Sequence, residues 1–329
     1  MTSPALPWLV FDVETTRLID STDGYNAFGP LREDHAPLGI TCAATLLADA
    51  DEAGTEREAR VWHAPLGDTA LLGTEHADFM LPLDARIMAD YLYDLCVVRK
   101  KARLLAFNGV SFDLRLLADV SEDPRTARKC RELAWGCYDP CFQLHCERGF
   151  PVGLAAMCAG MAVEGKSGKG ADAPEAWASR CPQRRNEVLE YCLEDVRATH
   201  RLAQAISHAK APQLKWISSR TEREAKHTWQ NRQRRLLPCK LCVLMSYPDV
   251  SWMHKAREPE QEGEAEQGVG QGAGQGAPAA SAPAAPVGAD GIAAAAAASS
   301  SGSLKRGGEA EAEGLGRKRR RAAERTVHL

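Results

Sequence analysis

Short apolar runs separated by polar stretches dominate the N-terminal part of the chain. Residues 8–11 form such a run, rich in residues that favour strands, and residues 40–47 and 60–63 form two more. Charged, turn-like stretches separate the three runs, so we expect three successive strands with antiparallel pairing. Residues 104–107 are a further short apolar run and predict another buried strand.

Helical spacing of apolar residues begins at residue 85. It extends over residues 85–98, and after an Asn-Gly turn it resumes over residues 112–120. Residues 125–133 form a basic and helical stretch, residues 138–161 indicate several helical turns, and residues 185–206 indicate a long helix. The order β-β-β-α-β-α, followed by helices, predicts an α/β domain.

The composition of the chain changes near its C-terminal quarter. Residues 213–254 mix tryptophans with charged residues, and we expect an irregular extension that packs on a domain formed by residues 1–212. Beyond residue 257 large apolar side chains almost vanish, so the chain there cannot bury enough surface to offset its ordering entropy. We therefore expect residues 255–329 to be a disordered low-complexity tail.

Composition limits the class of protein. The chain has 329 residues, of which 44% are hydrophobic and 26% charged, enough for one substantial core. Its formal net charge of −3 gives no general attraction to nucleic acid, so such binding would need local basic patches or bridging metal ions. We expect no leader and no membrane span, because no apolar run is long enough, and we expect a soluble protein whose eleven cysteines are reduced.

Acidic residues occur at two places that suit metal chemistry. Asp12 and Glu14 lie two positions apart at the end of the first predicted strand and so share one of its faces. Two such carboxylates can bind one divalent cation, although Asp-x-Glu is also common at solvated strand ends. Asp113 falls in the first turn of a predicted helix, where Ser111 is a natural N-cap and the helix dipole also favours an acid.

A third acidic position lies on the long predicted helix. Tyr191 and Asp195 stand one turn apart there, and Asp195 shares the apolar arc with Cys192, Val196 and Thr199. A carboxylate on a packing face is costly unless it is hydrogen-bonded, paired with a cation or bound to a metal. The sequence leaves these alternatives open for Asp195 considered alone.

Three segments together resemble the exonuclease motifs of the DEDD superfamily, in order and at plausible separations. They are Phe-Asp-Val-Glu-Thr at 11–15, Phe-Asn-Gly-Val-Ser-Phe-Asp at 107–113 and Tyr-Cys-Leu-Glu-Asp at 191–195. The Tyr-x-x-x-Asp form resembles that of the Tyr subgroup, and Asn-Gly-x-x-Phe-Asp is similar to the motif of the proofreading exonuclease domain of B-family DNA polymerases. The resemblance spans about residues 9–253, but residues 137–146 have no clear counterpart.

The resemblance implies a ribonuclease H-like α/β fold, a mixed sheet flanked by helices, and a 3′-to-5′ exonuclease that acts on single-stranded DNA or RNA, with DNA slightly favoured. It implies two Mg²⁺ or Mn²⁺ ions about 4 Å apart. Asp12 would bridge both ions, and Glu14 and Asp195 would complete the ion that activates water. Asp113 would reach the other ion through water, and Tyr191 would position the attacking water. The residues expected to contact the terminal nucleotide are Thr15, Thr16 and Asn108.

Two other functions remain open. One is a catalytically silent member of the fold that binds nucleic acid or protein, and the other is a different phosphoryl-transfer enzyme such as an endonuclease, against which Tyr191 argues. Cys239 and Cys242 have the spacing of a zinc site, but no second such pair follows, so the pattern favours thiols over zinc ligands.

Basic residues suggest two further roles. Six of them are candidates for a path along the phosphate backbone, namely Arg125, Arg128, Lys129, Arg131, Lys166 and Lys169, although a solvated surface accounts for them equally well. Two basic clusters near the C-terminus are typical of a bipartite nuclear-import signal, with a non-specific nucleic-acid tether as the alternative. The clusters comprise Lys305, Arg306, Arg317, Lys318, Arg319, Arg320 and Arg321. We therefore expect binding by an import receptor and a nuclear location, or otherwise a cytoplasmic one.

Overall fold

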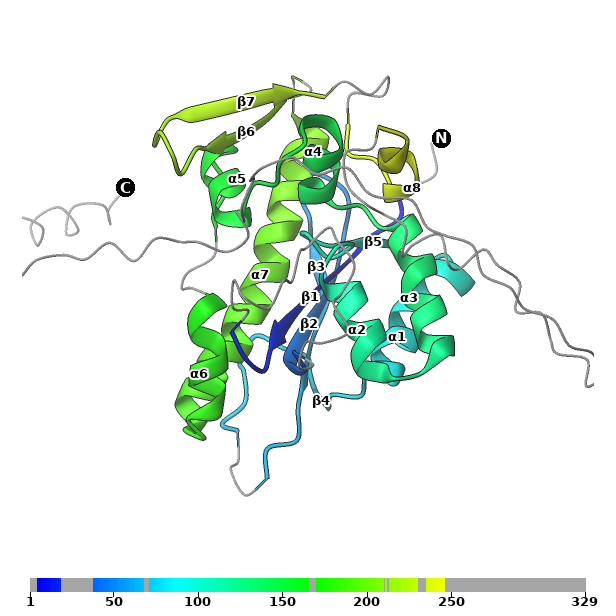
Figure 1. Cartoon of the computed structure of the whole chain (residues 1–329), viewed down its shortest axis with the longest axis vertical. Coiled ribbons are helices and arrows are strands. Elements are labelled where there is room, and N and C mark those ends of the chain that lie inside the picture. Colours follow the sequence, from blue (N-terminus) through cyan, green and yellow to red (C-terminus); the bar gives the residue numbers. More distant parts are fainter. Residues whose placement is uncertain are drawn as a thin grey trace, which may run out of the picture. The chain divides into compact units, whose positions relative to one another are not determined.

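A mixed sheet of five strands lies at the centre of the folded chain (Figure 1). The computed structural model describes residues 5–18, 38–67, 71–165, 170–209, 211, 213–229 and 235–245. The strands are β1 (Trp8–Thr15), β2 (Ile40–Ala48), β3 (Glu56–His63), β4 (Phe79–Pro82) and β5 (Arg103–Leu105), in the order β4-β3-β2-β1-β5. β2 pairs antiparallel with both β1 and β3, whereas β5 is parallel to β1 and β4 is parallel to β3. The predicted α/β class is confirmed, while β4 was not predicted.

The sheet is buried on both faces, and this explains the nearly continuous apolar sequence of β1. Leu9, Phe11 and Val13 belong to the core on one face, whereas Trp8 and Val10 belong to the core on the other. Side chains alternate along a strand. The even-numbered residues of β1 therefore share the face of Val10, and Asp12 and Glu14 lie on this face.

Helices cover both faces (Figure 1). The face of Leu9 and Phe11 packs against α1 (Ala85–Tyr93), α2 (Asp113–Ser121) and α3 (Pro124–Gly136), and the face of Val10 packs against α5 (Leu154–Gly160), α6 (Ala173–Ala178) and α7 (Pro182–His208). α4 (Pro140–Arg148) contributes to both cores, with Leu144 in one and Phe142 in the other. Short elements complete the described chain: η2 (Asp94–Val98), η3 (Gly170–Asp172), α8 (Cys239–Cys242) and η4 (Val243–Met245).

The predicted helices are confirmed with two changes. The helix predicted over residues 85–98 is α-helical only to Tyr93 and ends in the π-helical turn η2. The N-cap predicted at Ser111 is wrong, because the chain turns at Asn108 and Phe112 takes the N-cap position of α2. Asp113 still occupies the first turn of that helix.

The segment that follows α7 is more regular than predicted. Residues 213–228 contain an antiparallel hairpin of β6 (Gln213–Ile217) and β7 (Glu224–Thr228) in place of the irregular extension that we expected. Leu214 and Trp216 are buried on its inner side, and Gly160 of α5 lets the backbone approach, since a Cβ there would lie 2.3 Å from the Cα of Trp216. Lys215 and Glu224 form an ion pair on the solvent side. The inner positions of β7 are Ala225 and His227, which are too weakly apolar for this strand to stand out in the sequence.

Several predictions lie outside the described residues. They are the disordered tail over 255–329, the basic clusters within it, and Lys166 and Lys169. None of the helices in the described ranges is long and apolar enough to cross a membrane.

Candidate active site

The C-terminal half of β1 extends beyond the strand that flanks it. β5 ends at Leu105, which pairs with Val10, so from Phe11 onward this edge of β1 has no partner strand in the described part of the chain. On its other edge β1 stays paired with β2, with an irregularity between Glu14 and Thr15. The backbone of the acidic motif is therefore held on one side and accessible to side chains on the other.

Asp12 and Glu14 meet a thiol from α7 on their side of the sheet. The Sγ atom of Cys192 lies 3.8 Å from Oδ2 of Asp12, and one ligand atom each of Asp12, Glu14 and Cys192 all lie within 4.8 Å of one another. Glu14 is buried, Asp12 is half-buried and Cys192 is fully buried. The predicted placement of the two carboxylates on one face is confirmed. The thiol was not predicted as part of the group.

Asp113, at the start of α2, contacts the same strand. The backbone N–H of Val13, between the two acids in sequence, donates a 3.0 Å hydrogen bond to Oδ1 of Asp113. Asp113 is 3% exposed, and burial raises the pKa of its carboxyl to about 7 against the opposing effect of the Val13 hydrogen bond. The nearby charges of Asp139 and Asp195 raise this pKa further. A proton or a cation therefore relieves the cost of this carboxylate.

Asp195 comes from the third motif and faces the sheet. α7 packs across β1 and β2 and buries Asp195 to 6% exposure, together with its neighbours Cys192 and Val196. Its charge is among those that raise the pKa of the Asp113 carboxyl. The structure thus brings Asp12 and Glu14 together and joins Asp113 to the same strand, while Asp195 lies on the sheet-facing side of α7 outside the ligand-spaced group.

A buried carboxylate that the sequence reasoning missed holds the loop before Asp113. Asp139 is fully buried, and its Oδ1 accepts hydrogen bonds from the N–H of Asn108 at 2.9 Å and of Phe142 at 3.0 Å, while its Oδ2 accepts from Val110 at 3.2 Å. Burial raises the pKa of Asp139 to about 6, against the effect of these hydrogen bonds. The signal in the sequence was Asp139-Pro140, the pattern of an N-cap followed by proline at the first helical position.

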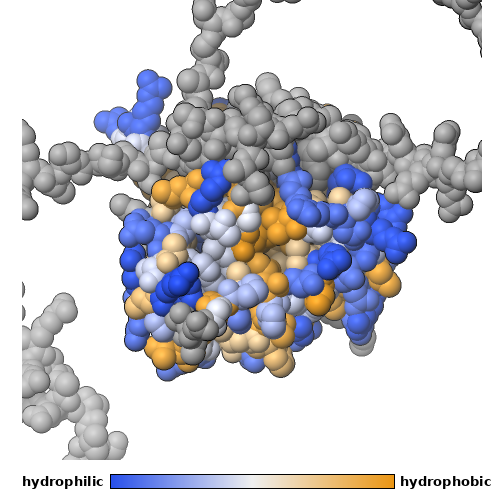
Figure 2. Space-filling model, turned by 60° about the horizontal axis from the view of Figure 1, so that its bottom comes forward, coloured by the Kyte–Doolittle hydropathy of each residue, from blue (hydrophilic) through white to orange (hydrophobic). Residues whose placement is uncertain are grey.

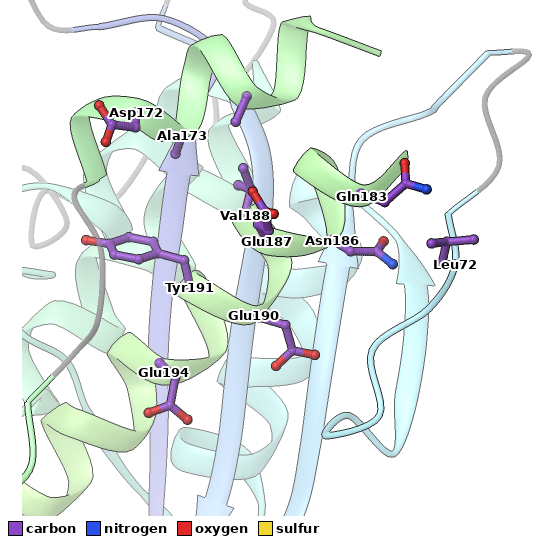
Figure 3. A pocket seen from close by; sticks show the side chains of 11 residues that line it. Leu72, Asp172, Ala173, Gln183, Asn186, Glu187, Val188, Glu190, Tyr191 and Glu194 are labelled. Carbon is purple, nitrogen blue, oxygen red and sulfur yellow. The ribbon is translucent and has the colours of Figure 1, made fainter. Parts of the chain in front are cut away.

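Tyr191 lies on α7 one turn before Asp195 and borders a depression between α6, α7 and the loop at Leu72 (Figure 3). The depression is lined by Leu72, Asp172, Ala173, Ala176, Gln183, Asn186, Glu187, Val188, Glu190, Tyr191 and Glu194. Its lining includes Tyr191 but none of the four acids of the three motifs. A Cβ at Gly170 would lie 3.1 Å from the Tyr191 hydroxyl oxygen, so this glycine leaves room for the hydroxyl.

The residues predicted to contact a nucleotide have local roles. The Thr15 hydroxyl donates a 2.8 Å hydrogen bond to the carbonyl of Arg17, and the Thr16 hydroxyl donates to the carbonyl of Leu38. Asn108 adopts a φ of 63° at the turn, and its Oδ1 accepts no hydrogen bond from the described residues. Their contact with substrate stays a prediction.

The residues predicted to form a basic path differ in their exposure and in their contacts. Arg125 and Arg128 on α3 are exposed, Arg131 is half-buried, and Lys129 forms an ion pair with Asp90. The end of the sheet at which β1 stops comes forward in Figure 2, which shows a band of apolar residues (orange) between hydrophilic margins. Apolar as well as charged surface is therefore available on this face.

The cysteines are free thiols, and all eleven lie in the described part of the chain. Cys239 and Cys242 are buried in α8, and the N–H of Cys239 donates to the carbonyl of Cys137 at 2.7 Å. Within the described ranges, Asp12, Glu14 and Cys192 form the one group of three or more side chains spaced to hold a metal ion.

No protein-family model matches the chain, and no curated protein matches it either.

Proposed function

We propose that the chain is a metal-dependent 3′-to-5′ exonuclease that hydrolyses phosphodiester bonds at the 3′ end of single-stranded nucleic acid, with DNA slightly favoured over RNA. The observation that carries this proposal is the pair Asp12 and Glu14 on one face of β1, with Asp113 hydrogen-bonded to the same strand and Asp195 buried on the helix that packs against it. Asp12 and Glu14 belong to a group of side chains spaced to hold one metal ion. Asp113 accepts a hydrogen bond from the backbone N–H of Val13, which lies between them in the strand. The resemblance of the three motifs to those of DEDD exonucleases supports the same function.

The donor set suits hard divalent cations. Carboxylate oxygens are the ligands that Mg²⁺ and Mn²⁺ prefer. Burial and neighbouring acids raise the pKa of Asp113 to about 7, and a cation would remove this cost. Asp12, Glu14, Asp113 and Asp195 would hold the ions. When bound, two such ions supply an activated water and stabilise the leaving 3′ oxygen.

Other residues of the chain position these groups. The hydrogen bond from the Val13 N–H holds one carboxylate oxygen of Asp113 against β1. Asp139 fixes the loop that carries Asn108. Tyr191, whose hydroxyl fits against Gly170, is the group that would orient the attacking water by a hydrogen bond.

The test is shortening of a 5′-labelled single strand, as DNA and as RNA, by full-length protein with Mg²⁺ or Mn²⁺. We expect a ladder of progressively shorter products. Asp12→Asn and Asp195→Asn should lower the rate by about a hundredfold or more, since each removes a charge that binds the ions. Glu52→Gln changes an exposed acid in the turn between β2 and β3, and this control should retain the wild-type rate.

Two outcomes would contradict the proposal. Absence of metal-dependent shortening of either strand by folded protein would favour a catalytically silent binding module. Shortening that survives in Asp12→Asn and Asp195→Asn would show that these carboxylates do not carry the activity.

A further inference from the structure

Cys192 places a sulfur atom beside the acids of β1. Its Sγ lies 3.8 Å from Oδ2 of Asp12 and also 3.8 Å from the backbone oxygen of Asp12. The side chain is fully buried, on the face of α7 that packs against the sheet. The thiol is therefore held next to Asp12 and Glu14 by the packing of the helix.

The spacing matches coordination of one ion by all three side chains. Zn–S and Zn–O bonds of about 2.3 and 2.1 Å at a tetrahedral angle separate sulfur from oxygen by about 3.6 Å. The observed separation of 3.8 Å between Cys192 and Asp12 differs little from this value, and the Glu14 ligand atom lies within 4.8 Å of both.

Sulfur changes which ions the group prefers. Mg²⁺ takes oxygen ligands, whereas thiolate ligands favour softer ions such as Zn²⁺. Cd²⁺ is softer still and serves as a probe. When such an ion binds the sulfur, the thiol proton is released to the solvent.

We propose that Asp12, Glu14 and Cys192 form a binding site for a thiophilic divalent cation, Zn²⁺ or Cd²⁺, which competes with Mg²⁺ or Mn²⁺ for the two carboxylates. The site is separate from Cys239 and Cys242. Its role as an inhibitory site rests on the proposed exonuclease, whereas the binding itself does not.

The test is a titration of full-length protein with Cd²⁺, read by the ultraviolet charge-transfer absorption of a thiolate bound to cadmium. We expect Cys192→Ser to lose the tightest saturable step and to bind Cd²⁺ at least about tenfold more weakly, the loss that even supporting residues of metal sites produce. Cys158→Ser is the matched control, because Cys158 is also fully buried on the same face of the sheet and lies outside the ligand group. It should retain the wild-type isotherm.

Wild-type absorption and affinity in folded Cys192→Ser would overturn the proposal. Competition provides a second test that needs no variant, since excess Mg²⁺ should shift the wild-type Cd²⁺ isotherm to higher concentration, and an unshifted tight step would contradict the shared carboxylates.

The inhibitory role has its own readout. Zn²⁺ added to the Mg²⁺-dependent reaction should inhibit wild-type protein at a concentration at least about tenfold lower than Cys192→Ser. If the protein has no exonuclease activity, the Cd²⁺ isotherms still decide whether the site exists, so failure of the function and failure of the site are distinguishable.

Discussion

At Asp113 burial opposes ionisation in the absence of a cation. Its folded-state pKa of about 7 exceeds the ordinary value of 3.8, so between these values the folded chain keeps a proton that the unfolded chain has lost. The retained proton stabilises the folded chain relative to the unfolded chain. This contribution is fully present below about pH 4 and is lost as the pH rises through 7. Ionised Asp113 therefore lowers the stability of the metal-free protein.

The variant Asp113→Asn keeps an oxygen that can accept the hydrogen bond from the Val13 N–H, but it carries no charge. With a chelator present, we expect the free energy of unfolding of the variant to exceed that of wild type by an amount that grows from pH 4 to pH 7, to the order of 4 kcal/mol. Urea unfolding at several pH values measures it. A difference that does not change with pH would contradict the account, and added Mg²⁺ should stabilise wild type more than the variant.

Gly170 is the second residue with a specific prediction. A methyl group there would lie 3.1 Å from the Tyr191 hydroxyl oxygen, so the hydroxyl would have to move by a few tenths of an ångström. We expect Gly170→Ala to lower the exonuclease rate roughly tenfold, because small misplacement of a positioning group is costly. In a Tyr191→Phe background, Gly170→Ala should cause almost no further loss. Independent, multiplicative losses in the double variant would show that Gly170 does not act through the hydroxyl.

At the scale of elements, Asp139 joins two parts of the fold. It caps α4 and also binds two N–H groups of the loop before α2. Asp139→Ala leaves these buried donors without their acceptor and should destabilise the protein by about 3 kcal/mol. Asp123→Ala, which removes the cap of α3 at a more exposed site, should cost clearly less. Equal losses in urea unfolding would contradict the joining role.

Local pattern predicted the strands β1, β2 and β3, the long helix α7 and the shared face of Asp12 and Glu14, because each depends on periodicity alone. The four-residue strand β4 escaped notice since it is short, half-exposed and ends in Pro82. The contacts of Asp113 with Val13 and of Cys192 with Asp12 join residues 100 and 180 positions apart. Such contacts depend on how the elements pack, which no local pattern encodes.

At the scale of the whole molecule, the described residues carry the proposed chemistry, and the basic clusters at 305–306 and 317–321 suggest where it takes place. We propose that they direct nuclear import. A fluorescent fusion of the full chain should accumulate in the nucleus and lose this accumulation when both clusters are changed to alanine. Nuclear accumulation that survives the change would contradict the import role, and a fusion with either cluster changed separately shows whether both are needed.

The central claim is hydrolysis from a free 3′ end by the acids of β1, α2 and α7. The most direct measurement compares a linear single strand with a closed circle of the same sequence, incubated with the protein and Mg²⁺ or Mn²⁺. The account predicts that the linear strand is shortened from its 3′ end while the circle stays intact, and that Asp12→Asn spares both. Cleavage of the circle at a similar rate would show an endonuclease, and an intact linear strand would show that this protein does not use the site to cut nucleic acid.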